Sequence, residues 1–152
     1  MNYVRHIVLL LLVAGTARAQ TDTDMIKRVI EQETTAYLNA DYKTWADAWV
    51  HEPYVYWSYT GSSGTRLVEG WEAMKKAFER YFKSAHPAAG EVVNRWEEIR
   101  IYENGAYVRF TQHITEGRDQ SETVQIRTLE KQGLTWRIVC MQAIDKALPV
   151  KK

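Results

Sequence analysis

The spacing of hydrophobic residues changes near residue 90. Before this point they mostly recur every three or four positions, which is typical of helices with one buried face. After it they alternate with polar residues, which is typical of strands in a sheet with two different faces. Helices followed by a run of strands predict an α+β domain, with the helices packed on one face of a curved antiparallel sheet.

Three helices are expected. Residues 24–39 carry hydrophobic side chains at helical spacing, and Asp41 is a suitable N-cap for a second, short helix. Gly70 opens a third helix, which Pro87 and Gly90 end. The residues expected on one face of each helix are Met25, Ile26, Val29, Ile30, Glu33, Tyr37 and Leu38, then Trp45, Ala48 and Trp49, and finally Trp71, Met74, Ala77, Phe78, Tyr81 and Phe82.

Two short strands and four longer ones are expected. The aromatic-rich residues 54–59 predict a strand, residues 61–64 a turn, and Leu67 with Val68 a second short strand. The four longer strands are predicted at residues 92–102, 106–116, 122–131 and 135–145. Their turns are expected at Asn104–Gly105, at residues 116–120 and at Gln132–Gly133. Asn-Gly between two alternating segments is among the strongest short hairpin signals.

The first twenty residues have the parts of an export signal. Arg5 and His6 precede an apolar run, and Ala17 and Ala19 have the A-x-A spacing of a cleavage site. A transmembrane anchor needs about 20 consecutive apolar residues, and this run is roughly half as long. We therefore expect a signal peptide at residues 1–19 and one domain at residues 20–152, located in the periplasm or secreted.

The composition limits the partners of that domain. The formal net charge is +1, which argues against nucleic acid because phosphate binding requires a strongly basic surface. No membrane association is expected once the signal is removed. The only cysteine, Cys140, cannot form an internal disulfide, so an exported domain must rely on packing. Six tryptophans and nine tyrosines fit an aromatic core, an aromatic pocket, or both.

Two arginines are predicted to lie opposite each other in the sheet. Arg109 and Arg127 are each nine positions from Arg118, the middle of the expected turn at residues 116–120. A symmetric hairpin would pair them directly, and like charges paired across strands repel. Either solvent screens the two guanidinium groups, or a negatively charged group lies between them.

The alternation assigns the remaining strand residues to two faces. The face of the two arginines would also carry Tyr107, Thr111, His113, Gln125, Leu129, Trp136, Ile138, Cys140 and Gln142. The other face would carry Ile99, Ile101, Val108, Phe110, Ile114, Val124, Ile126, Val139 and Met141. In one interpretation the second, more apolar face is the core and the arginines are solvated. In the other, helices cover the mixed face around a pocket and a second subunit covers the apolar face.

Several segments together carry a family resemblance. They are the break at Asp41, the segment Leu67-Val68-Glu69-Gly70, the segment from Ala106 to Gln112, and Arg127 nine residues before Trp136-Arg137-Ile138-Val139. With the order of elements, they resemble the nuclear-transport-factor-two-like (SnoaL-like) superfamily. Within it the chain is most similar to the association domain of calcium/calmodulin-dependent protein kinase type II and its bacterial relatives.

The resemblance implies a cone-shaped fold, a deep pocket between the helices and the concave face of the sheet, and dimers or larger homo-oligomers formed through the sheet. It also implies that Arg109 and Arg127 project into the pocket, where the association domain accepts small carboxylates. Guanidinium groups suit this ligand because each presents paired N–H groups to carboxylate oxygens. The expected ligand-binding residues are Arg109, Arg127, Tyr107, His113, Trp49, Trp57, Trp71, Met74 and Gln142.

The chain also departs from the association domain. That domain has a histidine four residues beyond the glycine that opens the third helix, where this chain has Met74. It has a further arginine where this chain has Ala143, and a histidine where this chain has Gln142. Of the basic pocket residues, Arg109 and Arg127 are retained, and those at the positions of Met74 and Ala143 are lost, so a larger or less charged ligand is also compatible with the sequence.

The same superfamily contains isomerases, dehydratases and hydrolases, so an enzyme is the alternative. Such sites need a general acid or base in an apolar cone. His113 with Tyr107 is the first candidate pair, and His51 with Tyr54 or Tyr56 is the second. A lone strand histidine is more often structural. A third hypothesis is an oligomerisation module without a ligand.

Metal and cofactor chemistry receive little support. The histidines at positions 51, 86 and 113 lack the close spacing of metal ligands, so no metal site is expected, and no motif calls for a cofactor. The aromatic run Tyr54, Tyr56, Trp57 and Tyr59 either stacks on a flat ligand or forms a hydrophobic wall. We expect the wall.

Overall fold

The computed structural model describes residues 21–88 and 90–146. The predicted signal peptide lies outside the described residues and stays a prediction. The helices are α1 (Asp22–Leu38), α2 (Tyr42–Asp47) and α3 (Trp71–Ser84). The strands are β1 (Tyr56–Gly61), β2 (Gly64–Glu69), β3 (Gly90–Tyr102), β4 (Gly105–Glu116), β5 (Asp119–Gln132) and β6 (Thr135–Asp145). No helix among these described residues is long and apolar enough to span a bilayer.

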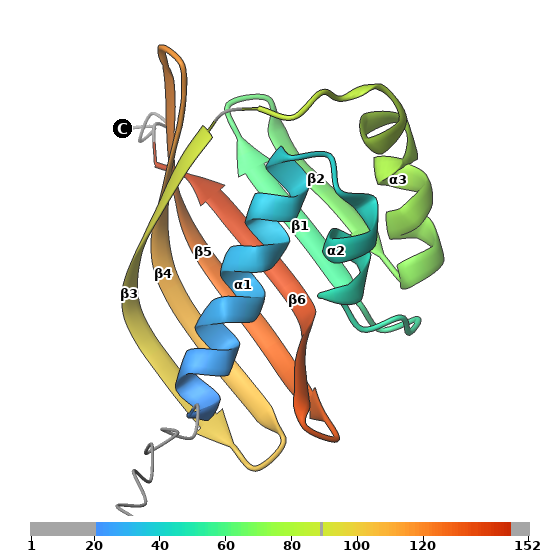
Figure 1. The fold of residues 1–152 in the computed structure, drawn as a ribbon, viewed down its shortest axis with the longest axis vertical. Coiled ribbons are helices and arrows are strands. Elements are labelled where there is room, and N and C mark those ends of the chain that lie inside the picture. Colours follow the sequence, from blue (N-terminus) through green and yellow to red (C-terminus); the bar gives the residue numbers. More distant parts are fainter. Residues whose placement is uncertain (1–20, 89, 147–152) are drawn as a thin grey trace, which may run out of the picture.

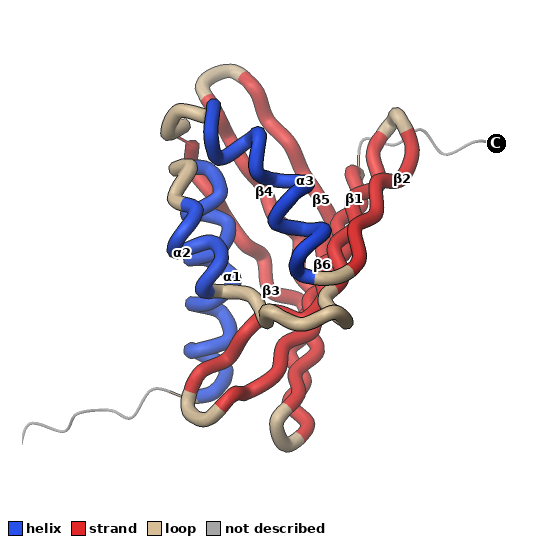
Figure 2. The backbone as a smooth tube through the Cα atoms, turned by 90° about the vertical axis from the view of Figure 1, so that its right-hand side faces the viewer, coloured by secondary structure: helices blue, strands red, loops and turns tan. Residues whose placement is uncertain are grey.

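The six strands form one mixed sheet in the order β2-β1-β6-β5-β4-β3. β3 to β6 make the predicted antiparallel meander, β1 and β2 make a hairpin, and β1 runs parallel to β6. α1 crosses the concave face of the sheet in front of the meander, and α3 stands beside the β1–β2 hairpin (Figure 1). Figure 2 shows the helices gathered on one side of the curved strands. The predicted α+β cone is therefore confirmed.

Local signals in the sequence explain how the helices begin. Thr21 and Asp24 form a reciprocal capping box at the start of α1. The Asp41 side chain accepts a hydrogen bond from the Thr44 amide at 3.1 Å, so it caps α2 as expected. Gly70 precedes α3 with a φ of 83°, and its amide donates to the Val55 carbonyl at 2.7 Å. A glycine suits this position because a left-handed φ strains other residues.

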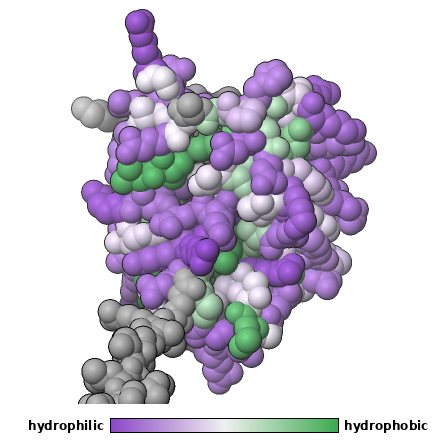
Figure 3. All heavy atoms as spheres, in the orientation of Figure 1, coloured by the Kyte–Doolittle hydropathy of each residue, from purple (hydrophilic) through white to green (hydrophobic). Residues whose placement is uncertain are grey.

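The core lies between the helices and the concave face. Trp45, Trp49 and Trp136 are fully buried there, and Phe78 and Trp71 pack on Trp45 with ring centroids 5.3 and 5.8 Å away. The outward face of α1 is mainly hydrophilic, with hydrophobic side chains in small separate areas (Figure 3). The buried aromatic residues therefore form a large part of the core between the helices and the sheet.

All three turns of the meander are displaced from their expected places. The first and third turns are displaced by one residue, and the centre of the second is displaced by half a residue. They are Glu103–Asn104, Gly117–Arg118 and Gly133–Leu134, each enclosed by a paired residue on either side. The first residue of each turn has a positive φ, namely 49° at Glu103, 61° at Gly117 and 64° at Gly133. Two-residue hairpin turns require this conformation at their first position, because it matches the twist of the strands.

The shifted β4–β5 turn overturns the predicted arginine pair. Arg109 pairs with Ile126, and Arg127 pairs with Val108. Directly paired residues share a face, so Arg127 points toward the helices with the buried Val108, whereas Arg109 points away from them. A one-residue change of register moves a side chain to the opposite face. The two arginines therefore cannot hold one ligand between them.

The same shift divides the predicted faces differently. Phe110 and Ile114 of β4 join Gln125 and Arg127 of β5 on the concave face, so the apolar residues of β4 belong to the core. In β6 a register shift at Val139 keeps Trp136 and Ile138 inside but turns Cys140 and Gln142 outward, opposite Thr128 and Ile126. The concave face is therefore mixed, with a polar half and an aromatic half.

Candidate functional site

A cavity of about 340 Å³ lies between the second half of α1, α3, the β1–β2 hairpin and the concave face. This is near the small end of the range for small-molecule sites. Its lining divides into a polar side and an aromatic side. The lining residues are Glu33, Thr34, Tyr37, Trp45, Trp57, Tyr59, Arg66, Phe78, Gln112, Ile114, Ser121, Thr123, Gln125, Arg127, Met141 and Ala143.

A buried ion pair forms the base of the polar side. Arg127 Nη2 of β5 lies 3.3 Å from Glu33 Oε2 of α1, and their side chains are 1% and 6% exposed. Glu33 also accepts hydrogen bonds from Trp45 Nε1 at 3.1 Å and from the Thr34 hydroxyl at 3.4 Å. Three donors thus surround this carboxylate. Such compensation is needed because an unpaired buried charge costs several kcal/mol.

The ion pair belongs to a closed ring of hydrogen bonds. Arg127 Nη2 donates to Gln125 Oε1 at 2.8 Å, and Gln125 Nε2 donates to Gln112 Oε1 at 2.7 Å. Gln112 Nε2 donates to the Thr34 hydroxyl at 3.2 Å, and that hydroxyl donates to Glu33, which closes the ring at Arg127. Arginine only donates and a carboxylate only accepts, so these two residues set the direction of every bond in the ring.

The side-chain amides of Gln112 and Gln125 each donate a second hydrogen bond to a residue outside the ring. Gln125 Nε2 also donates to the Thr123 hydroxyl at 3.0 Å, and Gln112 Nε2 also donates to Asn94 Oδ1 at 3.1 Å. Each amide nitrogen has two N–H groups, so neither has one left for a ligand. The ring therefore holds Arg127 in place and leaves Arg127 as the main source of donors on this side.

Arg127 itself is only partly satisfied. Its Nε and Nη1 are buried and have no hydrogen-bond partner among the described residues. Leaving buried donors unpaired costs about 1–3 kcal/mol each, and more for charged groups. Burial lowers the pKa of Arg127, while the nearby Glu33 opposes that change. A buried cation with free N–H groups beside a cavity is the arrangement that an anionic ligand would complete.

The other side of the cavity is aromatic and carries a second arginine. Trp57 of β1 and Phe78 of α3 meet edge to face with centroids 5.1 Å apart. The Arg66 guanidinium of β2 lies 5.8 Å from the Trp57 ring and 5.9 Å from the Phe78 ring. Tyr37 completes this side and stacks on Tyr81 at 4.2 Å. Arg66 is thus held over aromatic faces at the edge of the cavity.

The lining has few groups suited to proton transfer near neutral pH. Burial raises the pKa of Tyr37 to about 12 and raises the pKa of Tyr59, so both phenols keep their protons. Glu33 is held by three donors. No histidine lines this cavity in the part of the chain that the structure describes.

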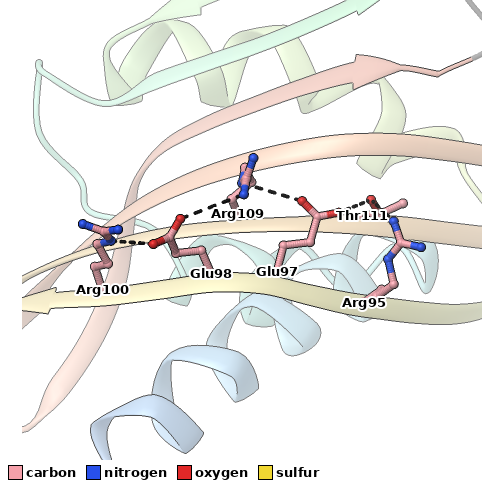
Figure 4. A network of polar contacts seen from close by, with 6 residues as sticks. All are labelled: Arg95, Glu97, Glu98, Arg100, Arg109 and Thr111. Carbon is pink, nitrogen blue, oxygen red and sulfur yellow. Dashed lines mark hydrogen bonds and ion pairs between the residues drawn. The ribbon is translucent and has the colours of Figure 1, made fainter.

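Arg109 lies on the convex face within a row of alternating charges (Figure 4). A bulge in β3 after Trp96 places Glu97 and Glu98 beside it, with Arg109 Nε 3.6 Å from Glu97 Oε2 and Arg109 Nη2 3.9 Å from Glu98 Oε2. Arg100 and Arg95 extend the row by pairing with these two glutamates. The arginine predicted to be a ligand anchor is therefore engaged elsewhere.

The Thr111 hydroxyl adds a hydrogen bond to this row by donating to Glu97 at 2.9 Å. This bond, followed by the one from Arg95, lowers the pKa of Glu97.

The other predicted site residues are distributed between three places. Trp57 lines the cavity with Arg127. Tyr107, His113 and Gln142 pair with outward-facing residues and lie on the convex side, so the expected His113–Tyr107 pair is outside the cavity. Trp49, Trp71 and Met74 are buried in the core and are not among the residues that line the cavity.

The second catalytic candidate is exposed. His51 stacks on Trp71 at 4.0 Å and shares a hydrogen bond of 2.9 Å with the Ala46 carbonyl. It is absent from the cavity lining, and its expected neighbour Tyr54 bonds to Glu130 instead. Within residues 21–88 and 90–146, no three His, Cys, Asp or Glu side chains come together as a metal site requires.

Four important residues were not among the predicted site residues. Glu33 is a charged residue within the hydrophobic stripe of α1, and that position signals a buried partner. Gln112 and Gln125 share a buried face with Phe110 and Leu129, which is a similar signal. Arg66 gave no such signal, because it lies on an exposed edge strand and reaches the cavity only through the packing of β2 beside α3.

Known proteins resemble this chain in structure rather than in sequence. No protein-family model matches the sequence, and no curated protein matches it. Solved structures do match. A nuclear-transport-factor-two-like protein of unknown function from Shewanella oneidensis is 17% identical, with a TM-score of 0.68 over 82% of this chain and 100% of that one.

Two further structures carry functional descriptions of their own. A protein from Parabacteroides distasonis, provisionally assigned as a ketosteroid isomerase, is 12% identical with a TM-score of 0.68 over 88% and 94% of the two chains. One from Thiobacillus denitrificans, provisionally assigned as a calcium/calmodulin-dependent protein kinase type II association domain, is 11% identical with a TM-score of 0.62 over 78% and 93%. These identities are low enough that the likeness concerns the fold alone. The chain therefore has the nuclear-transport-factor-two-like, cystatin-like fold.

Proposed function

We propose that the chain is a small-molecule-binding domain whose cavity accepts a small organic anion, anchored on Arg127. The observation that carries this proposal is the state of Arg127: it is 1% exposed, it lines the cavity, and its Nε and Nη1 lack partners among the described residues. A carboxylate matches these donors in charge, and its oxygens can accept a charge-assisted hydrogen bond from Nε or from Nη1. The aromatic side of the cavity suits an apolar body attached to that carboxylate.

Binding is favoured over a reaction. The proposed isomerase, dehydratase or hydrolase would need a proton-transferring group in the cavity, and the candidate His113 lies on the convex face. The cavity instead presents a rigid ring of hydrogen bonds around one cation. A fixed, partly satisfied cation is suited to recognition, because little ordering is required when the ligand arrives.

The test uses benzoate, with uncharged benzamide of similar shape for comparison. Calorimetry should show that benzoate binds the wild-type protein and benzamide binds far more weakly. The variant Glu33→Gln/Arg127→Met removes both buried charges together, so it avoids an unpaired charge in the core. Loss of two charge-assisted hydrogen bonds should weaken benzoate binding about 100-fold.

Arg109→Met is the matched control, because it removes an arginine of the neighbouring strand on the opposite face. It should leave benzoate binding unchanged. If benzoate binds the double variant as tightly as it binds the wild type, Arg127 is not the anchor. If benzoate does not bind the wild type at millimolar concentrations, the cavity does not accept this class of ligand.

We also propose that the domain is exported and forms a homodimer through the convex face. Support for export is the composition of residues 1–19. Support for the dimer is the row of alternating charges around Arg109, which a second copy could complement after a two-fold rotation (Figure 4). The exposed Val93 and Ile144 add apolar surface on the same face.

Sedimentation at micromolar concentration tests the dimer. The wild-type chain should sediment as a dimer, and Arg109→Glu should shift it toward the monomer because it places three negative groups side by side. A wild-type monomer would contradict this part of the proposal, and with it the alternative that the domain is an oligomerisation module. Mature protein beginning at Gln20 after expression with the full leader would support export.

A further inference from the structure

Arg66 is the one exposed charged residue among those that line the cavity. Its guanidinium group lies over the Trp57 and Phe78 rings, and it makes no ion pair and no hydrogen bond with any described residue. It nevertheless acts on the cavity, because its positive charge lowers the pKa of Tyr37 and so opposes the larger effect of burial. The cavity therefore has a second cation with free N–H groups, separate from the Glu33–Arg127 pair.

We infer that the ligand carries two anionic groups, one bound by Arg127 at the buried base and the other by Arg66 at the edge, with a flat apolar body between them. The first contact rests on the proposed function, and the second is new. It follows from the position of two incompletely satisfied arginines on one cavity, one on β5 and one on β2. Arg66 can present paired N–H groups to one carboxylate, and the unpaired Nε and Nη1 of Arg127 can each donate a hydrogen bond to an anionic oxygen.

The apolar residues that line the cavity together with the two arginines indicate the nature of the uncharged part of the ligand. Trp57, Phe78 and Tyr37 supply aromatic surface, and Met141 and Ala143 of β6 add apolar surface beside β1. Aromatic rings prefer offset or edge-to-face contacts with other rings, which a flat ligand can make within a narrow space. A cavity of about 340 Å³ suits a single ring with short substituents.

The polar side argues against a zwitterion or a cation. The Glu33 carboxylate already receives three donors, so most of its acceptor sites are occupied. The amide nitrogens of Gln112 and Gln125 have no N–H left to offer. The free hydrogen-bonding capacity of the charged groups is therefore that of donors, which selects for acceptors on the ligand.

The probes are benzoate and its three dicarboxylate counterparts, phthalate, isophthalate and terephthalate. They share one ring and differ in the presence and direction of a second carboxylate. At least one dicarboxylate should bind wild-type protein about two- to fivefold more tightly than benzoate, as expected for one added ion pair at an exposed arginine. Added salt should reduce that advantage, because the second contact is near solvent.

Arg66→Gln separates the second contact from the first. This variant keeps a hydrogen-bonding side chain on an exposed strand position and should fold normally. It should reduce the affinity of the favoured dicarboxylate to that of benzoate, and it should change benzoate affinity by less than about twofold. Arg109→Gln is the control and should leave both affinities unchanged.

The outcomes distinguish the two ideas. If none of the four probes binds, or if binding does not depend on Arg127, the proposed function fails. If benzoate binds through Arg127 but no dicarboxylate binds more tightly, the proposed function stands and the second contact is wrong. The second contact is also wrong if Arg66→Gln weakens benzoate and the dicarboxylates by the same factor.

Discussion

Replacing Glu33 with glutamine tests the buried ion pair without changing the shape of the core. The variant keeps one acceptor oxygen, which can face either Arg127 or Trp45 Nε1, and it removes the negative charge beside the Arg127 guanidinium. Removing one member of a buried pair costs about 3–5 kcal/mol. Because the amide oxygen of the substituted side chain can still accept from Arg127, we expect a loss of about 3 kcal/mol in the free energy of unfolding, at the lower end of that range.

That loss is a large part of the roughly 5–15 kcal/mol typical of a single domain, and the variant should still fold. Urea denaturation followed by tryptophan fluorescence measures it, since three tryptophans are fully buried in the core. Glu33→Gln, Arg127→Met and the double variant complete a double-mutant cycle. The double variant should lie within about 1 kcal/mol of wild type, because neutralising both members removes the buried charges together.

Glu31→Gln is the matched control, because it makes the same change on the exposed side of α1. It should alter the free energy of unfolding by less than about 0.5 kcal/mol. The reasoning is refuted if Glu33→Gln costs no more than this control, or if the two single variants are additive. Either result would mean that Glu33 and Arg127 do not depend on each other in the folded protein.

Two more predictions follow from local features. The pKa of Tyr37 is raised to about 12 by burial, so the folded state favours the neutral phenol; its stabilisation is full below about pH 10 and is lost as pH rises toward 12. Relative to Tyr37→Phe, wild type should lose about 1–2 kcal/mol over that window in urea titrations, after allowance for partial exposure. Gly117→Val should lower the free energy of unfolding by more than about 1 kcal/mol, because Gly117 has a φ of 61°. Arg118→Val should lower it by less, and equal effects of the two substitutions would argue against the two-residue turn.

The order and type of the elements could be predicted from the sequence. The change from helical to alternating spacing near residue 90 reflects two different packing geometries, and caps such as Asp41 act over a few residues. Gly70 marks the start of α3 for a similarly local reason. Features that depend on neighbouring residues in the chain were therefore predicted well.

The register of the β4–β5 hairpin was not predicted, and the site depended on it. The centre of a loop at Arg118 and the centre of a turn at Gly117–Arg118 differ by half a residue. This difference changes the pairing of the two strands by one residue, so Arg109 lies on the convex face and not at the cavity. Gly117 was the available signal, because a two-residue turn needs a positive φ at its first position. Arg66 could not be found this way, since its place at the cavity arises from contacts between distant segments.

The role of Arg127 is tested most directly at its own Nε–H group. In a protein labelled with ¹⁵N, this resonance can be identified by its loss in Glu33→Gln/Arg127→Met. Titration with benzoate should shift it in a saturable manner as the unpaired donor gains an acceptor, and benzamide should shift it far less. If benzoate binds while the Arg127 Nε–H resonance stays unchanged, the anion is held elsewhere and Arg127 is not its anchor.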